Sequence, residues 1–356
     1  MAFDNVLGHE GARAILARAL EQGRFPPALL LIGPEGIGKR TLALAAARAR
    51  VCEKGSGCGE CSICRRIDGA LATLQDARDR ARNSRDDAAM NHRLHPDVIL
   101  VEPWTTTKEG AGKAKPDIKV SQVNELVEET FSRPFEAKAR VFVIDDAHAM
   151  NIASANKLLK SLEEPPPTTH FLLVSASPQV LPQTIPSRCQ TLRLRPLPTS
   201  VLEAHLRDAR GFSADEARLR ASLADGSLGR ALAFEAGAYK QVRDEALALL
   251  LEDADPLKRI ARAELLTDAE DQLPLLMIAL RSLLRDVAAL RAGVAATQLL
   301  NPDVAEQLLP LAQGSLGLSA GGLAEKVAES LIAIQGNASK LLAMDALVDA
   351  PELTAP

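Results

Sequence analysis

The sequence predicts an α/β domain with a mainly parallel sheet covered by helices on both faces, followed by an all-helical region. Two observations lead to this prediction. Up to about residue 196, short apolar runs of strand length alternate with helical patterns, and this alternation is typical of parallel sheets. After residue 198 the strand signal ends, and Leu and Ala recur at helical spacing. The chain therefore changes structural class near residue 196.

Five short apolar runs predict the strands of the sheet, and each is bounded by Gly, Pro or polar residues. These runs are 28–32, 98–101, 141–144, 171–174 and 191–194. In contrast, the segment from Arg65 to His95 is rich in Arg, Asp and Ala and has no strand signal. This composition predicts a solvent-exposed charged helix or a mobile excursion.

The helical half divides into two parts. Residues 199 to about 238 predict a small helical bundle that ends near Tyr239, and a larger helical domain follows. Between Leu276 and Leu290 an apolar residue recurs every three or four positions, which predicts a helix with one apolar face. We expect this face to pack within its own bundle rather than against a partner. Residues 351–356 predict a frayed tail.

Composition excludes several classes of protein. The 356 residues are 47% apolar and 25% charged, with a net charge of −4, which excludes wholesale disorder. No apolar run approaches the ~18 residues of a membrane-spanning helix, and the first residues lack the pattern of a signal peptide, so we expect a cytoplasmic chain without a membrane partner. The near-neutral charge and the 3% aromatic content leave only local or partner-mediated contact with nucleic acid.

The stretch from Gly33 to Lys39 has the spacing of a phosphate-binding loop. It follows the first predicted strand and precedes a helical run. Glycines at Gly33, Gly36 and Gly38 allow backbone N–H groups to surround a phosphate at a helix N-terminus, while Lys39 neutralises the outer phosphates. The position of the loop between a strand and a helix makes this pattern specific.

One residue of the loop departs from the pattern. Where a Ser or Thr hydroxyl is required to coordinate Mg²⁺, the chain has Arg40, and a hydroxyl follows only at Thr41. One residue along a helix is a rotation of about 100°, so Thr41 should point away from the metal. We predict a phosphate cradle that is inert, or that binds nucleotide without hydrolysing it efficiently, and binding of ATP and Mg²⁺ is doubtful. The alternative is that Thr41 substitutes after a shift in the helix start.

Two acidic residues, Asp145 and Asp146, end the predicted strand 141–144. In P-loop ATPases the first acid after this strand helps to hold Mg²⁺, and Asp145 has that position. The alternative is a purely structural role, in which the strand is followed by a helix capped by Asp. The metal role and the capping role are compatible, and we expect both.

Four cysteines within thirteen residues predict a metal site. They are Cys52, Cys58, Cys61 and Cys64. Four thiolates surround a Zn²⁺ ion tetrahedrally and leave no open position, which is a structural rather than a catalytic arrangement, and a reducing compartment favours metal over disulfide. The spacing also allows an iron–sulfur cluster. His92 and His95 are ligands by type but superfluous beside four thiolates.

Three motifs carry a resemblance to a known family. The segments 144–151, 155–166 and 185–190 closely resemble the AAA+ clamp-loader subunits of bacterial DNA polymerase III, and residues 3–10 resemble the N-terminal segment of that family near its adenine pocket. The ordered motifs cover residues 1 to about 235, and the rest is matched only by its helical character and position.

The resemblance implies three domains that share in a pentameric ring. They are an AAA+ P-loop domain (1–196) with a zinc-binding insertion at about 52–64 and a charged insertion at about 65–95, a helical lid (197–238), and a helical collar (239–350) before the tail. The implied partners are gamma/tau and delta subunits, with the sliding clamp and primed DNA contacted through the complex. The implied metal of the four cysteines is zinc, which would fold a small knob without a core of its own.

Within this family, the altered loop and the Asp145–Asp146 pair resemble the delta-prime subunits more than the ATP-hydrolysing gamma/tau subunits, which usually have Glu at the second acidic position. The resemblance implies that Arg188 is an arginine finger supplied in trans to a neighbouring ATPase. It places Arg230 at the lid position that senses phosphate, where a structural ion pair is the alternative, and makes Cys189 a buried residue of the finger motif.

The implied protein is a non-catalytic subunit of the DNA-directed DNA polymerase with absent or weak ATPase activity of its own. Two alternatives remain open from the sequence. One is an active ATPase of the gamma/tau kind, and the other is a zinc-dependent nucleic-acid-binding module with a relic P-loop.

Overall fold

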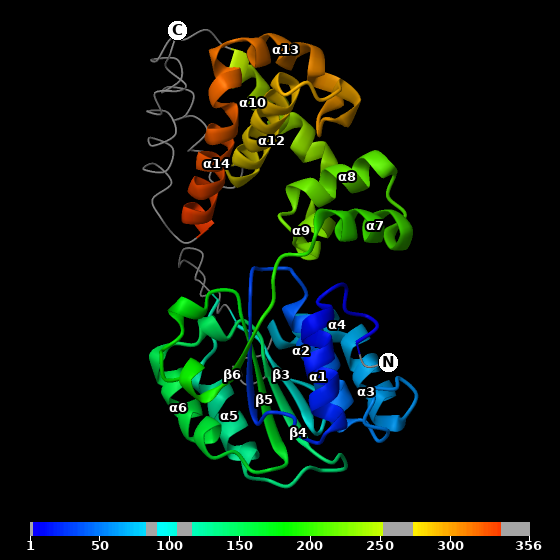
Figure 1. Ribbon diagram of the computed structural model, residues 1–356. Coiled ribbons are helices and arrows are strands. Elements are labelled where there is room, and N and C mark those ends of the chain that lie inside the picture. The colour runs from blue at the N-terminus through cyan, green and yellow to red at the C-terminus, as the bar shows by residue number, and fades with distance from the viewer. Residues whose placement is uncertain (1–2, 83–90, 105–115, 252–272, 336–356) are drawn as a thin grey trace. The chain divides into compact units, whose positions relative to one another are not determined.

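The computed structural model describes residues 3–82, 91–104, 116–251 and 273–335 (Figure 1). The chain divides into two compact units, one formed by residues 1–201 with 226–229 and the other by 202–225 with 230–356. The first unit is the predicted α/β domain and the second is helical, so the predicted change of class is confirmed. In the part that the structure describes, we find no helix both long enough and apolar enough to cross a membrane.

The first unit contains a six-stranded sheet in the order β2-β3-β4-β5-β1-β6. Its strands are β1 (Ala28–Ile32), β2 (Asn91–His95), β3 (Val98–Val101), β4 (Arg140–Ile144), β5 (Thr169–Ser175) and β6 (Gln190–Arg193). All neighbouring strands are parallel except the β2–β3 pair. All five predicted strands are present, within two residues of their expected ends.

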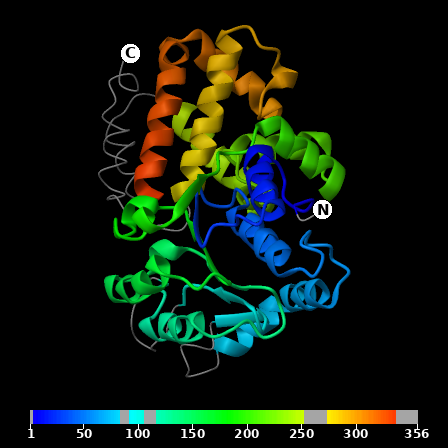
Figure 2. The same ribbon diagram turned by 60° about the horizontal axis from the view of Figure 1, so that its bottom comes forward.

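Helices cover both faces of this sheet (Figures 1 and 2). They are α1 (Glu10–Glu21), α2 (Lys39–Val51), α3 (Ser62–Ala72), α4 (Leu74–Arg82), α5 (Val120–Thr130) and α6 (Ile152–Glu163), with short 3-10 turns η2 (Ala147–Ala149), η3 (Pro178–Val180) and η4 (Pro186–Arg188). Alternate strand residues enter two separate cores. Leu29 and Leu31 of β1 pack with α1, α2 and α3, while Leu30 packs with α5 and α6.

The described residues of the second unit form helices and short 3-10 turns. They are α7 (Thr199–Arg210), which begins in the first unit, α8 (Ala214–Leu223), α9 (Leu228–Ala233), α10 (Ala236–Leu251), α12 (Leu273–Arg291), α13 (Ala305–Gln313) and α14 (Ser315–Gln335), with turns η5 (Ala296–Gln298) and η6 (Pro302–Val304). The predicted apolar face is confirmed, because Leu276, Leu283 and Val287 are buried in the core of this unit.

The boundary predicted between residues 238 and 239 falls inside α10. Tyr239 is buried there, and its hydroxyl lies 2.7 Å from Ser282 Oγ and donates to Asn301 Oδ1. The division of this region into a lid and a collar remains a prediction. The predicted tail at 351–356 lies outside the described residues.

The expectation for residues 65–95 is wrong in part. Its first portion forms the helices α3 and α4, but residues 91–95 form the edge strand β2, where no strand was expected. The strand carries Asn91, His92 and His95, which are buried, so the segment is not wholly exposed. Polar side chains hid this strand in the sequence, because they are buried through polar contacts rather than through apolar packing. His95 Nε2, for example, lies 2.7 Å from Glu136 Oε1.

A buried carboxylate fixes the turn before β4. Asp97 is fully buried, and its two oxygens accept the backbone N–H groups of Phe135, Glu136 and Ala137 at 2.6–2.9 Å. Burial alone would raise the pKa of the Asp97 carboxyl, but these three donors and the charge of Arg140 hold it below its usual 3.8.

We expect Asp97→Asn to lower the free energy of unfolding by about 2–3 kcal/mol, because an amide nitrogen would face backbone donors that now reach a charged oxygen. Urea denaturation measures this difference. Because the pKa of Asp97 is depressed in the folded state, its contribution is complete above pH ~3.8 and is lost as the pH falls through the folded-state pKa. The difference should therefore shrink in acid. Asp208→Asn, at an exposed position, is the control and should change stability by less than ~0.5 kcal/mol.

Candidate phosphate site and candidate metal centre

The glycine-rich loop connects β1 to α2, as the sequence predicts. Gly38 has a φ of 101° and lies directly before Lys39, the first residue of α2. Gly36 has a φ of 71°, and a Cβ atom there would lie 2.3 Å from Ser227 Oγ, so a side chain would be both strained and crowded. Its carbonyl accepts the N–H of Gly229 at 2.9 Å. The segment 226–229 therefore lies directly against the loop.

Lys39 is turned back on its own loop. Its side chain is buried, and Nζ donates a hydrogen bond to the carbonyl oxygen of Pro34 at 2.6 Å. Burial lowers the pKa of Lys39, and the nearby charges of Asp146 and Asp145 oppose this shift. The Lys39 ammonium group, which would bind a phosphate in a P-loop, is thus hydrogen-bonded to the loop's own backbone.

Arg40 bridges two buried carboxylates. Its Nη1 lies 3.2 Å from Asp145 Oδ2 and also pairs with Glu102 Oε1. Thr41, the next residue, is exposed. The guanidinium is therefore directed to the acid that the sequence assigned to Mg²⁺, whereas the Thr41 side chain reaches solvent.

Asp145 lies at the end of β4 and is 9% exposed. Burial raises its pKa to about 6; the charge of Arg40 opposes this shift, while the charges of Asp146 and Glu102 reinforce it. Its Oδ1 accepts the backbone N–H of Asp146 at 3.1 Å. Asp146 itself has a φ of 45°, in the left-handed region that non-glycine residues seldom adopt.

The Asp-capped helix expected after β4 is wrong. Asp146 precedes η2 and makes no side-chain cap hydrogen bond, whereas the cap of α6 is Asn151, whose side chain accepts the N–H of Ser154. The 3-10 turn η2 thus separates Asp145 and Asp146 from α6. Asp145 does not cap that helix and instead pairs with Arg40.

Glu102 completes this cluster and was missed from the sequence. It follows β3 directly, as Asp145 follows β4, and these two parallel strands pair Val101 with Ile144. The carboxyl ends of neighbouring parallel strands meet at one edge, which is the signal that could have identified it. Glu102 also accepts hydrogen bonds from Arg78 of α4, at 2.9 Å from Nε and 2.5 Å from Nη2.

The electrostatics of Glu102 follow from its neighbours. Burial alone would raise the pKa of its carboxyl, but His92 and Arg78, together with the charge of Arg40, hold the pKa well below its usual range. Nε2 of His92 lies 3.2 Å from Oε2. Glu102 is therefore a fixed anion that holds Arg40 in place. We call Arg40, Arg78, Glu102 and Asp145 the charge cluster.

The charge cluster disfavours a divalent cation beside Asp145. The half-buried Arg40 guanidinium already neutralises that carboxylate, and a second cation there would meet its repulsion at short range. The defect of the loop stays a prediction, for which the geometry supplies a physical cause. The hydroxyl is absent, and the group in its place is itself a cation bound to the acid.

A separate hollow of about 300 Å³ lies beside the N-terminal segment. It is lined by residues 8–12 on one side and by 193–198 with Val201 on the other. The N-terminal segment was expected near an adenine pocket, and this hollow is one of two concave features next to it; the other, of about 500 Å³, is lined by Phe3, Asp4 and Glu10 among others. That assignment stays a prediction.

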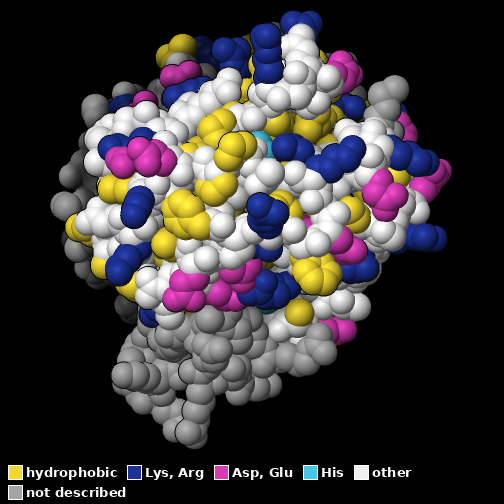
Figure 3. Space-filling model, turned by 90° about the horizontal axis from the view of Figure 1, so that it is seen from below, with side chains coloured by type: hydrophobic (Ala, Val, Ile, Leu, Met, Phe, Trp, Pro, Cys, Tyr) yellow, Lys and Arg dark blue, Asp and Glu magenta, His cyan; other side chains and the backbone are white. Residues whose placement is uncertain are grey.

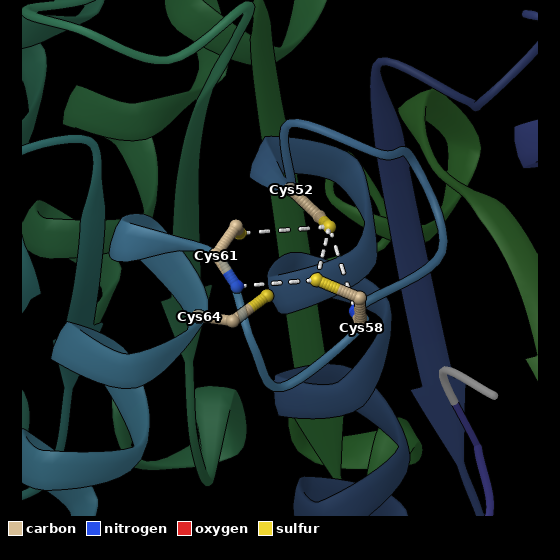
Figure 4. A group of neighbouring side chains, drawn as sticks. All are labelled: Cys52, Cys58, Cys61 and Cys64. Atoms are coloured by element: carbon tan, nitrogen blue, oxygen red, sulfur yellow. Dashed lines mark hydrogen bonds between the residues drawn. The ribbon is translucent and has the colours of Figure 1, made fainter.

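The four cysteines form one cluster, and their Sγ atoms all lie within 4.8 Å of one another (Figure 4). Cys52 Sγ lies 3.6 Å from Cys58 Sγ and 3.9 Å from Cys61 Sγ. Four sulfurs at ~2.3 Å from a tetrahedral Zn²⁺ lie about 3.8 Å apart, so these spacings fit zinc. They are far longer than the ~2.05 Å of a disulfide bond.

Backbone donors favour thiolates at two of these cysteines. The N–H of Cys58 donates to Cys52 Sγ, and the N–H of Cys61 donates to Cys58 Sγ, each at 3.4 Å. Burial would raise the pKa of Cys52, but backbone donors lower it to about 6, and backbone donors also lower the pKa of Cys58. Burial raises the pKa of Cys64. The cluster is consistent with a structural zinc site.

The expectation of a small knob without a core of its own needs correction. Cys52 directly follows α2, and Cys64 lies in the first turn of α3. The segment is not a knob without a core, because Ile63, Cys64 and Ile67 belong to the core shared with α1 and α2. The metal would therefore join α2 to α3 rather than fold a separate unit.

Arg188 lies on η4, and its Nε donates to Glu163 Oε1 at 2.6 Å. Its neighbour Cys189 was expected to be buried and is only half-buried; it packs against the α5–α6 core, and burial raises its pKa to about 12. Arg230 lies on α9, 3.8 Å from Asp225 Oδ2, which matches the ion pair offered as the alternative. The roles of Arg188 and Arg230 stay predictions.

The P-loop, the parallel sheet and the helical region that follows define an AAA+-like α/β protein. Residues 8–198 match the family described as "DNA polymerase III, delta subunit", which is more than half of the chain. The chain belongs to this family.

Individual relatives have two different names. The delta' subunit of Bacillus subtilis is 32% identical over 194 residues, which are 54% of this chain and 49% of that protein. The tau subunit of Salmonella typhimurium is 29% identical over 282 residues, which are 76% of this chain and 39% of that protein. The chain thus spans less than two thirds of the length of either relative.

Similar solved structures come from Thermotoga maritima. The RuvB Holliday junction branch migration motor has a TM-score of 0.39 and 18% identity, over 68% of this chain and 63% of that chain. A gamma subunit-related protein of DNA polymerase III has a TM-score of 0.36 and 15% identity, over 96% of this chain and 98% of that chain.

We expect Arg40→Thr to raise the affinity for ATP with Mg²⁺ at least about tenfold, because the change frees Asp145 and supplies the required hydroxyl. Isothermal titration calorimetry with Mg²⁺ and with EDTA separates metal-dependent binding from the rest. Arg40→Lys keeps a cation beside Asp145 and is the control, for which we expect no gain. Equal affinity of Arg40→Thr and wild type would show that another contact, such as that of Lys39 with Pro34, closes the loop.

We expect Cys61→Ser to reduce bound zinc from about one ion per chain to near zero and to lower the melting temperature, because a hydroxyl is a poor substitute for a thiolate ligand. Elemental analysis of the purified protein measures zinc and iron together. Cys189→Ser is the matched control and should retain the metal. Full zinc occupancy in Cys61→Ser, or iron in the wild type, would contradict a four-thiolate zinc site.

Proposed function

We propose that the chain is a clamp-loader subunit of bacterial DNA polymerase III of the delta-prime kind. In this role it helps to load the sliding clamp on primed DNA as a scaffold that does not hydrolyse ATP itself. The single observation that carries the proposal is the ion pair between Arg40 and Asp145. Family membership supports the clamp-loader assignment, and the charge cluster favours the delta-prime kind.

Hydrolysis of ATP by a P-loop protein needs Mg²⁺ between the β- and γ-phosphates, held by the loop hydroxyl and by the acid after the neighbouring strand. Here the first group is absent, and the second, Asp145, is neutralised by Arg40. Lys39 is engaged by Pro34 as well. These contacts support a loop whose remaining use is structural.

The contribution of this chain to hydrolysis would come through Arg188. An arginine supplied in trans stabilises the charge that develops on the γ-phosphate of a neighbouring subunit. The side chain of Arg188 is 32% exposed and is thus partly accessible to a second chain. Gamma/tau and delta subunits are the proposed partners, in a ring that contacts the clamp and primed DNA.

The four-cysteine site would serve the same scaffold. Zinc held by four thiolates has no open position for a substrate, so its contribution is to stability. It would tie the end of α2, the helix that begins at Lys39, to the start of α3.

A gamma/tau-type ATPase is the second candidate. It is favoured by the retained Lys39, by the three loop glycines and by the longer match to the tau subunit. This candidate requires Mg²⁺-dependent turnover by the isolated chain that is abolished by Lys39→Ala.

A zinc-dependent nucleic-acid-binding module is the other alternative. Such a module would lose its DNA affinity when zinc is removed by a chelator, while ring assembly survives. The face in Figure 3 shows basic, acidic and hydrophobic side chains intermixed.

Reconstitution tests the proposal directly. The chain is purified alone and with gamma/tau and delta subunits, and bound zinc, bound nucleotide, stoichiometry and ATPase rate are measured together. We expect zinc without turnover in the isolated chain and a defined stoichiometry in the complex. Turnover by the isolated chain would favour the second candidate.

We expect Arg188→Ala to leave the complex assembled but to lower its clamp- and DNA-stimulated ATPase rate by a factor of ~10³, because an arginine finger contributes about that much. Steady-state hydrolysis measures the rate, and size-exclusion chromatography measures assembly. Arg210→Ala, at an exposed position on α7, is the control. Loss of assembly together with activity would make Arg188 an architectural residue.

A further inference from the structure

We propose that Glu163 is a positioning residue for Arg188, which holds the guanidinium in the orientation that this chain presents to a neighbouring subunit. The inference rests on the proposed function, because it assumes that Arg188 acts on a neighbour's ATP. It assigns a role to a residue outside the three-residue Ser187-Arg188-Cys189 motif.

The guanidinium of Arg188 is held from two sides. Nε donates to Glu163 Oε1 at 2.6 Å, and Nη2 pairs with the same oxygen. From the other side, Nη1 donates to the carbonyl oxygen of Thr184 at 3.0 Å and to Ser187 Oγ at 3.3 Å. All three nitrogens are therefore engaged, which fixes the plane of the group as well as its position.

The two residues that hold the guanidinium, Glu163 and Thr184, lie next to buried parts of the fold. Glu163 is the last residue of α6, a helix whose Leu158 and Leu162 are buried in the core. Three prolines, at 165–167, follow it closely and restrict the backbone there. Thr184 lies directly before Ile185, which is also fully buried. A side chain held by residues of a packed helix and of a segment fixed in the core keeps its orientation better than one held by an exposed loop.

The pair contributes little to the stability of the fold. The side chain of Glu163 is 45% exposed and that of Arg188 is 32% exposed, and ion pairs at such positions are weak because water competes for both charges. The pair instead restricts an arginine side chain that otherwise samples many rotamers. Orientation before the reaction is the property that makes a charged group effective in catalysis.

The substitutions at Glu163 separate orientation from charge. Glu163→Gln keeps an oxygen that accepts from Nε and removes the negative charge, whereas Glu163→Ala removes both. If Glu163 positions Arg188, the glutamine variant works nearly as well as wild type. If Glu163 only masks the positive charge, both variants raise the rate.

The test uses the reconstituted complex with the clamp and primed DNA. We expect Glu163→Ala to lower kcat for ATP hydrolysis by about 10-fold to 100-fold, with KM for ATP and assembly unchanged, and Glu163→Gln to restore most of the rate. The double variant Glu163→Ala/Arg188→Ala should match Arg188→Ala, because the effect passes through Arg188. Glu164→Ala, one residue further on, is the matched control and should match wild type.

The outcomes separate this inference from the proposed function. A normal rate in Arg188→Ala overturns the proposed function, and with it the role of Glu163. A reduced rate in Arg188→Ala beside a normal or raised rate in Glu163→Ala overturns the inference alone. Loss of assembly or of folding in Glu163→Ala, measured by size exclusion and thermal melting, would also overturn it, because Glu163 would then be a structural residue.

Discussion

The ion pair of Arg40 with Asp145 and Glu102 is the contact on which the account of this protein depends. It exists because two neighbouring parallel strands end at one edge of the sheet and each is followed at once by a carboxylate. Arg40, the second residue of α2, reaches both carboxylates with its guanidinium. Asp145 is buried, so removing Arg40 would leave this carboxylate without its opposite charge and would destabilise the fold. The cluster is therefore part of the fold as well as the closure of a site.

Several elements converge on this contact. Arg78 from α4 and His92 from β2 hold Glu102, so the charged segment that precedes β3 supports the phosphate loop. The helix that carries Arg40 ends directly before Cys52, where the four-cysteine cluster begins. A metal bound there would fix the far end of the same helix. The loop, the insertion and the cysteines form one connected structure rather than three separate features.

The sequence predicted the parts of this protein that depend on local composition. The strands at 28–32 and 98–101 have the predicted bounds because they are buried apolar runs, and the cysteines cluster because their spacing is short. Strand β2 could not be predicted from the sequence, because its polar residues are buried through polar contacts and it has no apolar run. Asp146 was assigned a helix cap that Asn151 provides, because the intervening 3-10 turn has no sequence signal of its own.

Side-chain pairs between residues far apart in the sequence could not be predicted either. Arg40 and Glu102 are 62 residues apart, and Arg188 and Glu163 are 25 residues apart. The substitution at Arg40 predicted the loss of a ligand, but only the fold shows that the new side chain binds the acid it would have served. The pairing of Arg188 could likewise be found only after α6 and η4 had been placed side by side. Spacing identifies candidate residues, whereas their partners follow from topology.

The most direct measurement is equilibrium binding of ATP to the isolated wild-type chain, with Mg²⁺ and with EDTA. Because Arg40 neutralises Asp145, we predict the same weak affinity in both conditions, together with no turnover. An affinity that rises tenfold or more with Mg²⁺, accompanied by hydrolysis, would contradict the claim that this guanidinium closes the metal position.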